Sequence, residues 1–100
     1  MYISGDFMIK LKVIDLDVWG NQEEGFEINN FFNIGEIEFP KKSDPHSISK
    51  SLLKTKLVSG GFLKPEARRK IDLDDCSSMD FFYQVTEKKT GKPLYNIEVV

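Results

Sequence analysis

The sequence is poor in the residues that build metal centres and covalent catalytic sites. Its 100 residues include one cysteine, Cys76, and one histidine, His46. A lone cysteine cannot form a disulfide within the chain, and a lone histidine excludes a metal site built from several histidines. A catalytic pair would need Cys76 and His46 to meet by chance in the fold. We therefore expect no catalytic residues, no metal and no cofactor, and predict that the protein is not an enzyme.

Long apolar runs are also missing. No stretch approaches the roughly 20 apolar residues of a membrane span, and the first residues, MYISGDF, lack the basic region and apolar stretch of a secretory signal. We expect a cytoplasmic protein with no membrane contact. Hydrophobic residues make up 40% of the chain, which suffices for one core, so we expect a single domain over residues 1–100, with residues 1–7 as a disordered leader.

Lysine and arginine are absent from residues 13–40, which carry seven acidic residues. The next thirty residues reverse this pattern, with nine basic residues against Asp44 and Glu66. Two readings stay open. The two segments compensate each other in the folded domain, as solvated charge runs usually do, or one of them meets a partner of opposite charge. Aspartates that lie close in sequence, such as Asp15 and Asp17, are interpreted as solvated carboxylates and not as cation ligands.

The apolar pattern predicts a long antiparallel hairpin over residues 8–39. The pattern changes face between Val13 and Ile14, which indicates a β-bulge or a strand covered on different faces along its length. In the second strand Phe26, Ile28, Phe32 and Ile34 share one face, and the pattern slips again at Gly35. The polar residues 20–25 form the turn.

One helix and three further strands are expected after the hairpin. Ser43-Asp44-Pro45 supplies the helix start, Gly60-Gly61 ends the helix, and its apolar face is formed by Ile48, Leu52, Leu53 and Leu57. Strands are predicted at 69–74, 81–86 and 94–99. The fold class is therefore α+β, an antiparallel sheet with two hairpins and one helix in the order β-β-α-β-β-β. An exposed last strand ending at Val100 would allow a homodimer.

The acidic hairpin is the first candidate binding surface. We interpret Trp19 as a residue that packs within the hairpin, with an exposed partner anchor as the other reading. Phe31, opposite in phase to Phe26 and Ile28, is the aromatic expected on the outer face. The residues proposed to bind a protein partner are Trp19, Asn21, Glu23, Glu24, Glu27 and Phe31.

The basic segment supports an alternative, the binding of single-stranded nucleic acid. Cations that follow a phosphate backbone and an aromatic that stacks on a base would serve this function. Phe62 is the only aromatic residue there, and we interpret it first as the contact that closes the helix C-terminus. The residues of this alternative are Lys54, Lys56, Phe62, Lys64, Arg68, Arg69 and Lys70.

The strings DVWGNQEEGFEINNFFNIGEI and EKKTGKPLYNIEV carry a resemblance to a known group. They resemble segments of small uncharacterised accessory proteins of bacteriophages. The resemblance covers about half of the chain and implies a setting, the cytoplasm of a host cell, where small phage proteins bind host or viral macromolecules. It implies no catalytic residues.

Overall fold

The computed structural model describes residues 8–40, 48–76 and 82–100, and these form an α+β domain. The described residues contain five strands, one α-helix and one 3-10 helix. The elements in chain order are β1 (Met8–Asn21), β2 (Gly25–Pro40), α1 (Lys50–Ser59), η3 (Pro65–Lys70), β3 (Ile71–Asp75), β4 (Tyr83–Glu87) and β5 (Pro93–Val99). The leader predicted at residues 1–7 lies outside the described residues.

The strands form one antiparallel sheet in the order β2-β1-β5-β4-β3. The expected α+β class and antiparallel sheet are confirmed, but the order in the sheet is not the order in the chain. The last strand, β5, lies between β1 and β4 and pairs with both. The expectation of an exposed last strand is therefore wrong, because β2 and β3 are the edges. This removes the basis for a homodimer through β5.

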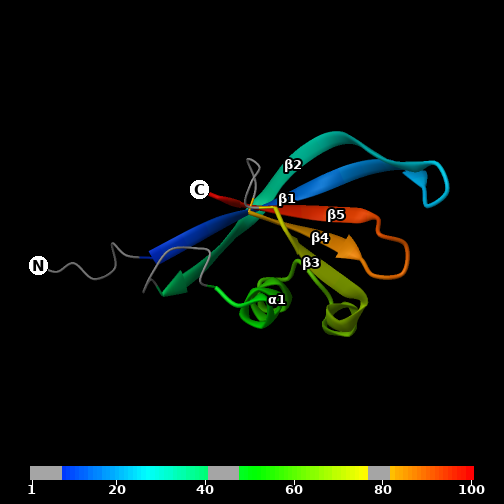
Figure 1. Cartoon of the computed structure of the whole chain (residues 1–100). Helices are drawn as coiled ribbons and strands as arrows, with labels where there is room; N and C mark the ends of the chain where they lie inside the picture. The colour runs from blue at the N-terminus through cyan, green and yellow to red at the C-terminus, as the bar shows by residue number, and fades with distance from the viewer. Residues whose placement is uncertain (1–7, 41–47, 77–81) are drawn as a thin grey trace, which may run out of the picture.

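The helix packs on one face of the sheet and forms the core with it (Figure 1). Leu53 and Leu57 are fully buried there. Leu52 was predicted to belong to the same apolar face, but it is 43% exposed and lies outside that face. The sheet contributes the inward residues of all five strands, which are Leu11, Val13, Ile37, Phe39, Ile71, Leu73, Tyr83, Val85 and Ile97. Ile48, Leu63 and Phe82 complete this core.

The helix begins later than its sequence predicted. The hydroxyl of Ser49 accepts a hydrogen bond from the Leu52 amide at 3.1 Å, so Ser49 is the N-cap. The start predicted at Ser43-Asp44-Pro45 lies outside the described residues. At the other end, Gly61 has a φ of +86°, as the predicted glycine cap requires. Arg69 and Lys70, expected in a strand, belong to η3, a 3-10 helix that the sequence did not indicate.

Two β-bulges in β2 determine which side chains lie on each face of the long hairpin. Val13 pairs with Gly35 but Ile14 pairs with Asn33, so Ile34 is an extra residue on β2. Likewise Asp17 pairs with Asn30 and Val18 with Ile28, so Asn29 is extra. The predicted register slip after Val13 is confirmed. Because β1 keeps its alternation against β5, Leu11 and Val13 face the helix, while Ile14 and Leu16 are buried on the opposite face.

The end of the hairpin projects beyond the sheet as a two-stranded arm. β5 pairs with β1 only as far as Asp15, whereas β1 and β2 continue to pair up to Asn21 and Gly25. We call residues 16–31 the hairpin arm. Figure 1 shows it running past the other strands to its turn, and it contributes to principal extents of 55, 27 and 21 Å.

No helix among the described residues is long and apolar enough to cross a membrane.

Candidate binding surfaces

A tight turn closes the tip of the hairpin arm. The side-chain oxygen Oδ1 of Asn21 accepts a hydrogen bond from the Glu24 amide at 2.8 Å. Gly20 and Gly25 flank the turn. Their φ angles of 104° and 92° are positive, a backbone conformation that favours glycine. Asn21, predicted to bind a partner, therefore holds the turn, and Glu23 and Glu24 project from it as exposed carboxylates.

The two faces of the arm differ in chemistry. Cross-strand partners share a face, so the face on the helix side carries the pairs Asp15–Phe32, Asp17–Asn30 and Trp19–Glu27. Asn30 donates a hydrogen bond from Nδ2 to the Asp17 carboxylate at 3.2 Å. The opposite face is apolar, with the pairs Leu16–Phe31, Val18–Ile28 and Gly20–Phe26.

The bulge at Asn29 changes the predicted position of Phe31. The sequence pattern placed Phe31 opposite in phase to Phe26 and Ile28, and Phe32 in phase with them. The extra residue reverses this, so Phe31 shares the face of Phe26 and Ile28, and Phe32 lies on the other. Phe31 is nevertheless exposed, as expected.

Large apolar side chains are exposed on both faces of the arm and at its base. Trp19 is 63% exposed, Phe31 60%, Phe32 53% and the bulged Ile34 44%. The interpretation of Trp19 as a packed residue is wrong, because β1 extends past the core at that point. Phe32 and Ile34 were missed because the pattern placed them inward. The glycine at 35 marked the slip but not which strand held the extra residue.

A shallow hollow of about 370 Å³ lies beside Trp19 at the tip. Two carboxylates, of Glu24 and Glu27, line it together with Trp19, Phe26 and the backbone of Gly20 and Gly25. An aromatic face beside carboxylates is a surrounding that attracts a cationic side chain.

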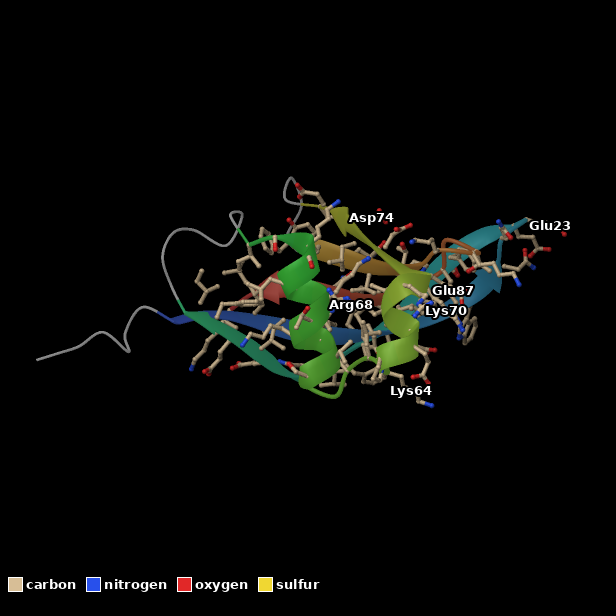
Figure 2. The ribbon with its side chains drawn as sticks, turned by 90° about the horizontal axis from the view of Figure 1, so that it is seen from below. Glu23, Lys64, Arg68, Lys70, Asp74 and Glu87 are labelled. Carbon is tan, nitrogen blue, oxygen red and sulfur yellow. The ribbon has the colours of Figure 1, made fainter. Side chains whose placement is uncertain are left out.

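The acidic charge of the arm is not neutralised within the described part of the chain. Residues 16–31 contain four acidic residues and no basic one. The two ion pairs between described residues, Lys10–Glu38 at 3.9 Å and Lys12–Glu98 at 3.6 Å, lie elsewhere on the sheet. Figure 2 shows Glu23 at the far tip, while Lys64, Arg68 and Lys70 lie beside α1 and η3. The acidic tip of the arm and the cations beside α1 and η3 therefore lie on separate regions of the described surface.

The residues of the nucleic-acid alternative are divided among different surroundings. The Phe62 ring is half-buried and packs against the core. The backbone amide of Phe62, which follows the end of α1, donates a hydrogen bond to the carbonyl of Leu57 within the helix. The Lys56 ammonium lies over the Phe39 ring, 5.6 Å from its centre. Lys64, Arg68, Arg69 and Lys70 lie on or next to η3. This set of residues provides cations, but little of the Phe62 ring is left exposed for stacking on a base.

Titratable groups with displaced pKa values lie on the sheet or directly after one of its strands, away from the arm tip. Burial, followed by the carboxylates of Asp74 and Asp75, raises the pKa of the Cys76 thiol. Burial and Asp75 raise the pKa of Tyr83, and burial and Asp15 raise that of Tyr95. His46 lies outside the described residues. Within the ranges that the structure covers, no three acidic, histidine or cysteine side chains are grouped to hold a metal ion.

Comparisons with known proteins identify no relative. No protein-family model matches the chain, and neither a curated protein nor a solved structure resembles it significantly.

Proposed function

We propose that the protein is a non-enzymatic binding protein that engages a protein partner through the hairpin arm. The observation that carries this proposal is the exposure of Trp19, Phe31 and Phe32 on a hairpin whose tip holds acidic residues and no basic ones. Exposed aromatic residues on a projecting element are typical of interfaces, where tryptophan supplies much of the binding energy. In keeping with the resemblance in its sequence, the protein would act as an accessory factor of a phage or mobile element.

The arm favours a partner with basic and apolar groups. The hollow beside Trp19 would receive a lysine or arginine side chain, which contacts the indole face and the carboxylates of Glu24 and Glu27. Phe31, on the other face of the arm, would bury apolar surface worth about 2 kcal/mol if fully covered. The separated acidic charge would speed association with such a partner at low salt.

Single-stranded nucleic-acid binding by the basic segment has less support. The cations around η3 favour contact with phosphates, but the packing of Phe62 removes much of the stacking surface that such proteins use. This alternative predicts a mobility shift of an oligonucleotide that weakens steeply with salt. The absence of any shift at low salt would exclude it.

Charge reversal at the tip tests the protein-binding proposal. In a pull-down from a lysate of the cell that makes the protein, Glu24→Lys combined with Glu27→Lys should remove the partner. The matched control is Glu66→Lys combined with Asp72→Lys, which reverses two exposed carboxylates outside the arm. Capture that survives the first pair, or that fails equally with the second, would contradict the proposal.

A further inference from the structure

A second hollow lies on another part of the surface, between α1 and η3. Its volume is about 370 Å³, and it is lined by Lys50, Ser51, Lys54, Pro65, Arg68 and Arg69. Four of these six residues are cationic and none is acidic. Such a concentration of one charge is unexpected in a chain whose net charge is −2, because charged residues on ordinary surfaces are interspersed.

Two of the four cations in this hollow are held by neutral groups. The Arg68 guanidinium donates from Nη2 to the carbonyl and the hydroxyl of Ser51, at 3.3 and 3.2 Å. The Lys54 ammonium donates to the Ile71 carbonyl at 3.2 Å. These bonds position both side chains without neutralising their charge. An ammonium has three donors and a guanidinium five, so both retain donors for a ligand.

No carboxylate among the described residues pairs with these cations. The two ion pairs formed between described residues involve Lys10 and Lys12, on β1. Lys50 and Arg69 are exposed at the rim of the hollow. Two hydrogen-bonded and two exposed positive charges therefore line one hollow, an arrangement that attracts a compact anion with several negative charges.

We infer that the hollow between α1 and η3 binds a small phosphate compound of the pyrophosphate class. Arginine presents paired donors that match phosphate oxygens, and lysines add charge without demanding a fixed direction. Pro65 is the only apolar residue among the described residues of the lining, and none of these residues has an aromatic ring on which a nucleotide base would stack. The negative charge of a diphosphate matches the four cations better than a single carboxylate would.

The test is calorimetric titration of the full chain with pyrophosphate at constant ionic strength. Lys50→Gln and Arg69→Gln are suitable variants, because neither side chain forms a hydrogen bond or an ion pair with another described residue. Each should weaken binding about tenfold, the effect of one charge-assisted hydrogen bond. Lys92→Gln, which removes an exposed charge outside the hollow, should change the affinity less than twofold.

Three results would overturn the inference. The first is no binding of pyrophosphate by the wild-type chain. The second is an equal loss in Lys92→Gln, which would indicate attraction to overall charge. The third is binding of a single-stranded oligonucleotide in preference to pyrophosphate, which would make the basic surface a nucleic-acid site. The Trp19→Ala variant should bind pyrophosphate as the wild type does, so this test is independent of the hairpin arm.

Discussion

The ring of Phe62 packs against the backbone of Gly35 and so joins the segment after α1 to strand β2. A Cβ atom at residue 35 would lie 2.8 Å from Cζ of Phe62 and 3.1 Å from Cε1. The same ring lies against Gly60, where a Cβ would be 2.9 Å from Cε2. Glycine at both positions lets the ring fill the space where the base of the hairpin arm meets the helix side of the sheet.

Gly35→Ala should destabilise the domain by about 1–3 kcal/mol, because the added methyl group forces the Phe62 ring to move. Urea unfolding measures the loss. In the Phe62→Leu background the same change should cost clearly less. As the control, Gly91→Ala adds a methyl group into open space at a φ of +80° and should cost the same in both backgrounds. Equal costs of Gly35→Ala with and without the Phe62 ring would contradict this packing.

Leu52 and Leu53 are adjacent in α1, but truncation should cost much more stability at Leu53 than at Leu52. Leu53→Ala should lower the free energy of unfolding by about 2–5 kcal/mol, since Leu53 is fully buried. Leu52→Ala should change it by less than about 0.5 kcal/mol, because Leu52 is 43% exposed. Similar losses in the two variants would show that the helix packs with a different face.

The sequence predicted the elements whose patterns are local. Gly20 and Asn21 marked the turn, and the slip after Val13 revealed a change of register. The position of β5 between β1 and β4 was not predictable, because strand order depends on long-range pairing. Phe31 was assigned to the wrong face because an extra residue at Asn29, which breaks no apolar pattern, reverses the side chains that follow it, up to the second bulge at Ile34.

The candidate sites were likewise predictable only in the features that depend on local sequence. Charge segregation was visible in the sequence, and it marked both the acidic arm and the basic segment. The exposure of Trp19 was not visible in the sequence, because this residue projects only where β1 extends beyond the partner strand β5. Lys50 and Ser51 were missed as part of a binding surface because they meet Arg68 only when η3 packs near α1.

Tyr95 should make stability sensitive to alkaline pH. Its hydroxyl donates a hydrogen bond to the Phe62 carbonyl at 3.0 Å, and burial and Asp15 raise its pKa above the usual 10.0. The unfolded chain then releases this proton at lower pH than the folded chain. The stabilisation is therefore complete below pH 10 and is lost as the pH rises through the folded-state pKa.

Tyr95→Phe tests this assignment. It should lower stability at neutral pH by about 1 kcal/mol, the value of one hydrogen bond, and should flatten the decline above about pH 10. Urea unfolding over a series of pH values measures both effects. Tyr83 and Cys76, whose pKa values are also raised, remain in the variant and account for the residual slope. A decline that is unchanged in Tyr95→Phe would exclude this residue as a cause.

The single tryptophan reports directly on the tip of the arm. Trp19 is 63% exposed, so the folded protein should show the red-shifted emission and ready acrylamide quenching of a solvated indole. Both should change little on unfolding. Addition of the partner should shift the emission to the blue and protect the indole, since binding removes water from it. Strong protection in the isolated chain would contradict an exposed Trp19.

Site-specific photocrosslinking tests the central claim most directly. A photoreactive amino acid replaces Phe31 in one variant and Leu52 in another, because both are exposed apolar positions but only the first lies on the hairpin arm. Binding through the arm predicts a covalent adduct with one partner protein from position 31, absent from position 52 and lost when Glu24→Lys and Glu27→Lys are added. The same adduct from both positions, or none from position 31 while the partner is still captured, would contradict it.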